Sequence, residues 1–238
     1  MKHKNREIPP QPIAGESFTI KEQFKYTDKQ LSIIKTGLNK DTKAIFCDGL
    51  WGSGKSYMAV LIALKLLSQK RVNSIVYIRN PVESSSLSRI GFIPGTIEDK
   101  MAPYNQIFFD KIYEFISKSE MDKLQKEGKI QCVPLGYSRG LSWSSKVIIV
   151  DEAASLTYDD ILLLLSRCGE HTKIIFIGDS VNQNDIGSKS GFKKMFDLFN
   201  DEESRKEGVF SFELKHSADI VRSGFVRFIM KKTGKIIQ

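Results

Sequence analysis

Short apolar runs alternate with longer amphipathic segments along most of the chain, from about residue 27 onward. The apolar runs occupy residues 44–47, 74–79, 130–134, 147–150, 174–177 and 210–214. Helices cover both faces of a parallel sheet, and its strands therefore read as nearly continuous apolar runs. Strands that alternate with helical segments are typical of βαβ units. The pattern predicts an α/β fold with three layers, in which helices flank a mostly parallel sheet.

The segments between the apolar runs carry signals for helices. We predict helices over residues 28–38, 55–69, 107–117, 120–127 and 159–168. Thr27 begins the first as its N-cap and Gln30 completes a capping box, and Thr157 and Asp160 have the same relation at the last. The stretch from Pro81 to Pro103 is too long for an ordinary connection. A functional role is therefore expected for it.

The sequence GLWGSGKS, from Gly49 to Ser56, follows the first predicted strand and opens the next helix. It satisfies G-x-x-x-x-G-K-[ST], in which glycines let backbone N–H groups converge on phosphates at a helix N-terminus. Lys55 is expected to reach the β and γ phosphates of a nucleotide, and the hydroxyl of Ser56 to bind Mg²⁺. The alternative is a glycine turn with a solvated lysine. Trp51 would either pack on the adjoining surface or meet a base.

A pair of carboxylates ends the apolar strand in VIIVDEA, Val147 to Ala153. Core strands avoid such residues because a buried unpaired charge is costly. Asp151 is expected to hold Mg²⁺ through water, and Glu152 to orient and deprotonate an attacking water. The strand at 174–177 leads to Asp179, with Gln183 shortly after it. A polar residue there would sense the γ phosphate, and the alternative is that Asp179 only forms a turn.

Composition adds limits to this interpretation. The chain has 238 residues, 41% of them apolar and 27% charged, as in ordinary soluble proteins. We predict a flexible arm over residues 1–20, without a secretory signal, followed by one folded domain over residues 21–238. No apolar run approaches the roughly 20 residues that cross a bilayer. Three scattered cysteines argue against disulfides or zinc and favour the cytoplasm. The net charge of +8 suits a polyanionic partner or a solvated positive face equally well.

Several motifs together resemble those of PhoH-like proteins. They are GLWGSGKS, RNPVE (79–83), IGFIPGTIEDKMAPY (90–104), PLGYSRG (134–140), VIIVDEA, IGD (177–179) and DIVRS (219–223), in the family's order and approximate spacing. The match covers about residues 26–230. The third motif is more specific than a phosphate loop, because nucleotide binding in general does not require it. The chain resembles a PhoH-family ATPase.

The resemblance implies a P-loop NTPase core with a RecA-like fold, related to the first domain of superfamily 1 helicases, and ATP and Mg²⁺ as cofactors. By the same likeness Gln30 would recognise adenine, although its capping role is also expected. Arg222 would be an arginine finger, the alternative being a surface ion pair. The implied nucleotide contacts are Gln30, Gly49, Leu50, Trp51, Gly52, Ser53, Gly54, Lys55, Ser56, Tyr57, Asp179 and Gln183.

The sequence departs from the family pattern after the strand at 174–177. The family usually has Gly-Asp-Pro-Thr-Gln there, whereas this chain has GDSVNQ, which places the glutamine one residue later. Either Asn182 or Gln183 would then face the nucleotide. Some family members also carry an appended nuclease-like or RNA-binding domain, for which a chain of this length has no room.

A single RecA-like lobe needs its arginine finger from elsewhere. We therefore expect Arg222 to reach the ATP of a neighbouring subunit in a homo-oligomeric ring, such as a hexamer. Single-stranded RNA or DNA would meet the face that carries the segment from Ser84 to Arg89 and the residues Arg79, Tyr137, Arg139 and Trp143. The alternative for Arg139 is an ion pair in the core.

Three functions follow from these interpretations. The first is a nucleic-acid-linked ATPase, such as a helicase or an RNA-remodelling motor. The second is a small-molecule kinase, which Glu152 disfavours because it suits water as the nucleophile. The third is a binding module that slow hydrolysis switches on and off. The motor is the expected function, with no membrane involved.

Overall fold

A computed structural model describes residues 18–22, 25–79, 97–182 and 185–234, except for the side chains of residues 97–101, 103 and 104. Its centre is a sheet of six strands in the order β3-β2-β4-β5-β1-β6, and every neighbouring pair is parallel. The strands are β1 (Ala44–Gly49), β2 (Ser74–Arg79), β3 (Ile130–Cys132), β4 (Lys146–Asp151), β5 (Lys173–Gly178) and β6 (Val209–Leu214). The predicted α/β fold with a parallel sheet is thus confirmed.

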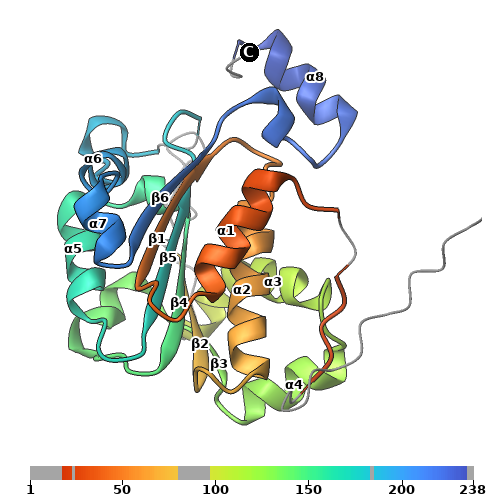
Figure 1. Cartoon of the computed structure of the whole chain (residues 1–238). Coiled ribbons are helices and arrows are strands. Elements are labelled where there is room, and N and C mark those ends of the chain that lie inside the picture. The colour runs from red at the N-terminus through yellow and green to blue at the C-terminus, as the bar shows by residue number, and fades with distance from the viewer. Residues whose placement is uncertain (1–17, 23–24, 80–96, 183–184, 235–238) are drawn as a thin grey trace, which may run out of the picture.

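Helices cover both faces of this sheet and make three layers (Figure 1). One face carries α1 (Asp28–Leu38), α2 (Lys55–Ser68), α3 (Ile97–Tyr113) and α4 (Lys118–Lys126). The opposite face carries α5 (Tyr158–Ser166), α6 (Phe192–Leu198) and α7 (Glu202–Lys206). The last helix, α8 (Gly224–Lys232), lies apart from both layers, near the connection from β1 to α2. Because all the strands are parallel, their carboxyl ends lie at the same edge of the sheet as this connection.

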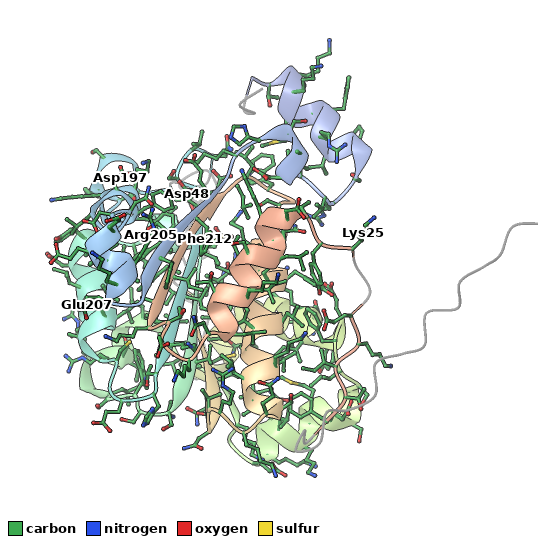
Figure 2. All side chains as sticks on the ribbon, viewed as in Figure 1. Lys25, Asp48, Asp197, Arg205, Glu207 and Phe212 are labelled. Carbon is green, nitrogen blue, oxygen red and sulfur yellow. The ribbon has the colours of Figure 1, made fainter. Side chains whose placement is uncertain are left out.

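The core consists of two apolar layers, one on each side of the sheet. Helix α2 is buried along most of its length and supplies fully buried side chains such as Leu61 and Ile62 to the first layer. In the second layer, the rings of Phe46 and Phe176 stack at 4.8 Å between centroids. Figure 2 shows how densely side chains fill the space between the sheet and its helices. Burial on this scale on both faces explains why the strands are continuous apolar runs.

The capping signals read from the sequence are present in the structure. The Thr27 hydroxyl accepts a bond from the Gln30 N–H at 3.3 Å, and the Gln30 side chain accepts one from the Thr27 N–H at 2.9 Å. Thr157 and Asp160 make the same reciprocal pair before α5. Both predicted capping boxes are confirmed, and the helices begin where the side chains satisfy the first free N–H groups.

The elements differ from prediction in a few places. Helix α3 spans Ile97–Tyr113, whereas the helix predicted at 107–117 began after Pro103 and ended later. The helix includes this proline, although a proline removes one backbone hydrogen bond. Strand β3 ends at Cys132, two residues before its predicted end. The short helices α6 and α7 and the terminal helix α8 were not predicted.

The segment before α1 packs on the domain. Phe18 and Ile20 contact the first core layer, and the Lys21 N–H donates to the Phe115 carbonyl at 2.8 Å. Residues 18–20 therefore belong with the packed domain, not with the arm predicted over residues 1–20. The rest of that arm lies outside the described residues. Among the helices of the described ranges, none has the length and apolar character that a membrane crossing requires.

Candidate nucleotide-binding site

The loop from Gly49 to Ser56 connects the end of β1 to the first turn of α2, as predicted. Gly52 and Gly54 have φ angles of +73° and +81°, which side chains rarely adopt. A Cβ on Gly49 would lie 2.7 Å from the Cβ of Leu214. The Lys55 ammonium donates to the carbonyls of Gly49 at 2.6 Å and of Leu50 at 3.0 Å. These contacts hold the lysine over the loop, ahead of the N-terminus of a 14-residue helix.

Helix α1 supports the loop from one side. The Gln30 side chain is buried, and its amide nitrogen donates to the Ser53 carbonyl at 3.0 Å. Its amide oxygen accepts from the Thr27 N–H. Gln30 thus touches the phosphate loop with one end and caps α1 with the other. Recognition of adenine by Gln30 stays a prediction.

The DIVRS segment supports the loop from the other side. The N–H groups of Val221 and Arg222 donate to the Gly52 carbonyl at 2.9 and 3.2 Å. Ile220 packs with Leu50 and Met230 in a small apolar cluster that joins α8 to the loop. A Cβ on Gly52 would lie 2.9 Å from the Cβ of Arg222. The exposed Arg222 side chain therefore starts directly beside the phosphate loop of its own chain.

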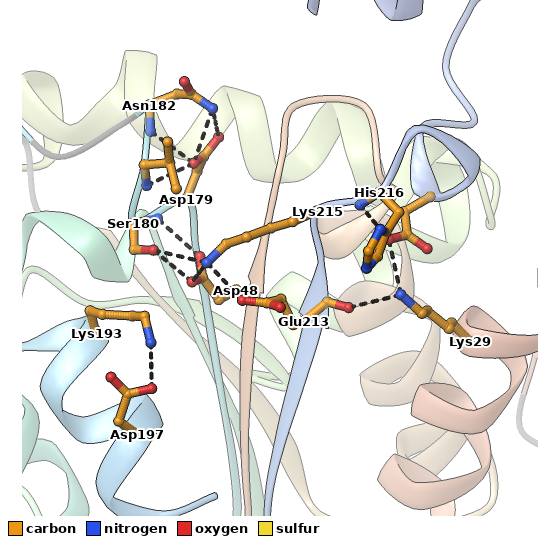
Figure 3. A network of polar contacts seen from close by, with 12 residues as sticks. Lys29, Asp48, Asp179, Ser180, Asn182, Lys193, Asp197, Glu213, Lys215 and His216 are labelled. Atoms are coloured by element: carbon orange, nitrogen blue, oxygen red, sulfur yellow. Dashed lines mark hydrogen bonds and ion pairs between the residues drawn. The ribbon is translucent and has the colours of Figure 1, made fainter. Parts of the chain in front are cut away.

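Buried Asp219 fixes this segment to α1. Its carboxylate accepts from the His216 N–H at 2.9 Å and lies 3.1 Å from the Lys29 ammonium. Figure 3 shows Lys29 reaching from α1 to these groups and to the Glu213 carbonyl. The sequence analysis did not predict this role, because Lys29 and Asp219 are 190 residues apart.

The carboxylates of Asp151 and Glu152 lie at the end of β4, on the same edge of the sheet as the loop. Strand β5 separates β4 from β1. The Tyr77 hydroxyl donates to Asp151 at 2.7 Å, and the Arg79 guanidinium lies 3.8 Å from Asp151 and 3.5 Å from Glu152. Burial and the Asp151 charge raise the pKa of Glu152 more than Arg79 and Lys55 lower it. A raised pKa suits a carboxylate that accepts a proton.

Glu152 has an unusual backbone conformation. Its φ angle is +55°, in the left-handed region that is strained for a residue with a Cβ. A short 3-10 turn, Ala153–Ser155, follows it, and Ala153 and Ala154 are fully buried. The buried turn holds the strained residue in place at the strand end. Such strain commonly occurs at functional sites.

The loop after β5 is organised by buried Asp179. Its carboxylate accepts from the N–H groups of Val181 and Asn182 at 3.1 and 2.9 Å, and from the Asn182 amide at 3.1 Å. This is the turn-forming role that the sequence left open as the alternative. Gln183 lies outside the described residues. A γ-phosphate-sensing role for Asp179, Asn182 or Gln183 stays a prediction.

The structure adds a buried ion pair that the sequence analysis missed. Lys215, just after β6, lies 2.6 Å from Asp48, and their side chains are 7% and 0% exposed. Asp48 also accepts from the Ser180 N–H at 2.9 Å and hydroxyl at 2.6 Å (Figure 3). The pair therefore ties together the ends of β1, β5 and β6 next to Gly49. A carboxylate that ends a buried strand was the signal used for Asp151, and it applies equally to Asp48.

The predicted nucleic-acid contacts fall into different environments. Tyr137 and Arg139 are exposed, so Arg139 does not make the core ion pair that was its alternative. Trp143 is 2% exposed and packs in the second core layer, so a base cannot stack on it. The prediction that Trp143 lies on the nucleic-acid face was therefore wrong. Polar neighbours in the sequence do not prevent an aromatic side chain from pointing into the core. Arg79 is paired with the acids, and Arg89 lies outside the described residues.

The residues at this edge of the sheet suit Mg²⁺ and a phosphate chain. Asp151 offers a carboxylate and Ser56 a hydroxyl, and oxygen atoms are the ligands that Mg²⁺ prefers. The positive φ angles of Gly52 and Gly54 and the lack of space at Gly49 leave a cradle built from backbone alone. The described ranges contain no group of three or more His, Cys, Asp or Glu residues placed to hold a metal ion, at this site or elsewhere.

The parallel sheet and the phosphate loop together give the chain the RecA-like fold of the P-loop NTPase class. Residues 23–233 match the sequence profile of a family described as PhoH-like protein. The chain belongs to this family.

Two curated relatives illustrate the match. A PhoH-like protein of Synechocystis sp. is 32% identical over 207 residues, which cover 86% of this chain and 60% of that protein. Protein PhoH of Escherichia coli is 31% identical over 180 residues, which cover 74% of this chain and 49% of that protein. The chain thus spans about half to three fifths of the length of these relatives.

Among solved structures, the large terminase of a thermophilic bacteriophage is similar in fold. The TM-score is 0.55 at 11% sequence identity, and the match covers 88% of this chain and 50% of the terminase. At this identity the likeness concerns the fold alone.

Proposed function

We propose that this protein hydrolyses ATP with Mg²⁺ and couples hydrolysis to the binding or remodelling of single-stranded RNA or DNA. The observation that carries the proposal is the phosphate loop at one edge of the sheet, with an acid pair at the end of β4 on the same edge. Membership of the PhoH-like family supports it.

Each part of the site has a role in this reaction. Backbone N–H groups of the loop and the Lys55 ammonium bind the β and γ phosphates. Asp151 and Ser56 would hold Mg²⁺, which neutralises charge on the phosphates when bound. Glu152 orients a water molecule and accepts its proton, a role that its raised pKa favours. Tyr77 holds the Asp151 carboxylate by a direct hydrogen bond.

Arg222 is proposed to stabilise charge that develops on the transferred phosphoryl group. Its main chain is bonded to Gly52 of its own chain, and its side chain is exposed. Mixing inactive Lys55→Ala and Arg222→Ala proteins distinguishes the two geometries. If Arg222 acts on a neighbouring subunit in the proposed ring, the mixture regains activity. No recovery, with assembly intact, would place the arginine in its own chain's site.

Nucleic acid is proposed to bind near exposed Tyr137 and Arg139, which combine an aromatic ring with a cation. Such pairs stack and hold single strands without reading their sequence. The net charge of +8 supports a polyanionic partner. Trp143 is no longer part of this proposal because it is buried.

ATP turnover measured alone, with single-stranded RNA and with single-stranded DNA tests the proposal. We expect turnover to rise with at least one polymer, and we expect Tyr137→Ala with Arg139→Ala to reduce that rise. Turnover that ignores both polymers would contradict the coupling and favour the slow-hydrolysis binding module. Transfer of the phosphate to a metabolite instead of water would identify a kinase.

A further inference from the structure

The Arg79 side chain lies between the two carboxylates of the proposed catalytic site. Arg79 is the last residue of β2, and the parallel register places it directly beside Asp151 on β4. One guanidinium nitrogen is 3.8 Å from an oxygen of Asp151, and another is 3.5 Å from an oxygen of Glu152. Both distances exceed the usual range of a hydrogen bond. The guanidinium therefore pairs with both acids through its charge, without a close hydrogen bond to either carboxylate.

Burial makes this position unsuited to direct contact with nucleic acid. The Arg79 side chain is 20% exposed, the Glu152 side chain 25% and the Asp151 side chain 8%. At this depth the positive charge of Arg79 is balanced by the two carboxylates beside it. The Tyr77 hydroxyl donates to the same Asp151 oxygen that Arg79 approaches. The phenol and the guanidinium therefore both approach Oδ2 of Asp151, the proposed Mg²⁺ ligand.

We propose that Arg79 is a positioning residue whose guanidinium opposes the binding of Mg²⁺ at Asp151. This inference deepens the proposed function, because it concerns the same acid pair. A Mg²⁺ ion at Asp151 and the nearby guanidinium would repel each other. Arg79 therefore raises the Mg²⁺ concentration at which the site is filled.

Lys55 does not take over this role. Its ammonium is bonded to the carbonyls of Gly49 and Leu50, which keep it on the phosphate loop. Removal of Arg79 therefore takes away the cation that pairs with both Asp151 and Glu152.

The test uses Mg²⁺ alone as the probe and thermal unfolding as the readout, so it does not depend on hydrolysis. Arg79→Gln removes the competing charge, and Arg71→Gln is the matched control. Arg71 precedes the other end of β2 and donates to the Leu38 carbonyl, far from the acids in the sheet. We expect Mg²⁺ to stabilise Arg79→Gln at a concentration about tenfold lower than it stabilises the wild type or the control.

Two further variants keep the test decisive. Arg79→Lys retains the charge on a shorter side chain, so it should lower the Mg²⁺ midpoint by a smaller amount than Arg79→Gln does. Arg79→Gln with Asp151→Asn should lose the Mg²⁺ effect. If Arg79→Gln is too unstable to study, Arg79→Lys is compared with the wild type in the same titration.

An unchanged or higher Mg²⁺ midpoint in Arg79→Gln overturns the proposal, as does an unchanged midpoint in Arg79→Lys when the first variant does not fold. A Mg²⁺ effect that persists in the double variant also overturns it, because the ion would then bind elsewhere. Failure of ATP hydrolysis in the wild type would contradict the proposed function without changing these outcomes.

Discussion

The buried pair of Asp48 and Lys215 gives the sharpest test of how the sheet edge is held together. Its side chains are 0% and 7% exposed. Lys215→Met leaves the Asp48 carboxylate buried, with only the two bonds from Ser180. Breaking a buried pair by removing one partner typically costs about 3–5 kcal/mol. Because Ser180 still satisfies both oxygens, we expect a loss of about 3 kcal/mol, at the lower end of this range.

The assay is reversible unfolding by urea and by heat. For a chain of this size a loss of 1 kcal/mol lowers the melting temperature by about 2–4 °C, so the expected decrease is about 6–12 °C. The control is Lys193→Met, which breaks the ion pair with Asp197 on the surface of α6. Those side chains are 48% and 58% exposed, so its loss should stay within about 1 kcal/mol.

A double variant separates the ion pair from general packing effects. Asp48→Asn with Lys215→Met removes both charges, so neither is left buried without a partner. Its loss should be smaller than the sum of the two single losses by about 1–3 kcal/mol. If Lys215→Met costs no more than Lys193→Met, or if the two losses simply add, the pair does not hold the sheet edge.

The same pair predicts a dependence on alkaline pH. Burial alone lowers the pKa of Lys215, but the hydrogen bonds and charges of Asp48 and Glu213 raise it above its ordinary value of 10.5. A raised pKa means that the folded protein binds the proton more tightly than the unfolded chain does. The stabilisation is therefore complete below pH 10.5 and is lost as the pH rises through the folded pKa. Lys215→Met should lack this part of the alkaline loss, and an identical loss in both proteins would contradict the assignment.

Two other substitutions test the loop and the acid pair. Gly52 has a positive φ, and an added Cβ would also meet a close neighbour; Gly187 has a positive φ of +57°, but an added Cβ would meet nothing within 4 Å. Thermal unfolding should therefore show that Gly52→Ala lowers the free energy of unfolding by ~1–2 kcal/mol more than Gly187→Ala does. Equal losses would show that the loop is not tightly packed at this glycine. Tyr77→Phe removes the bond to Asp151 and should cost ~1.5–3 kcal/mol, and a negligible loss would mean that the phenol does not hold the carboxylate.

The sequence was sufficient to predict most of the sheet and the phosphate loop. Strands buried on both faces have an apolar residue at nearly every position, so β2 begins and ends where it was predicted. The phosphate loop was equally predictable, because its glycines, which have positive φ, and its lysine at the start of a helix stand together in one short stretch of sequence. Helix α8 was not predicted, although its sequence GFVRFIMKK is amphipathic. Only Met230 in it is buried, and Phe225 and Phe228 are exposed, so its apolar residues contribute little to the core.

Contacts between distant residues were not predictable in the same way. Arg79 was assigned to a nucleic-acid face because it was grouped with other cationic and aromatic residues. Its partners are instead Asp151, 72 residues further along the chain, and the adjacent Glu152. Trp143 was assigned to the same face, and only the packing of the second core layer shows that it points inward. The partners of Asp48 come from two other strand ends. Such pairings depend on strand order, which local patterns do not specify.

The central claim is that the phosphate loop binds the triphosphate and that Glu152 activates water to cleave it. The most direct measurement compares nucleotide binding and phosphate release from ATP with Mg²⁺ in the wild type, Lys55→Ala and Glu152→Gln. We predict that Lys55→Ala loses both, whereas Glu152→Gln still binds ATP and releases phosphate about 10²-fold more slowly or less. Phosphate release that neither substitution changes would contradict the account.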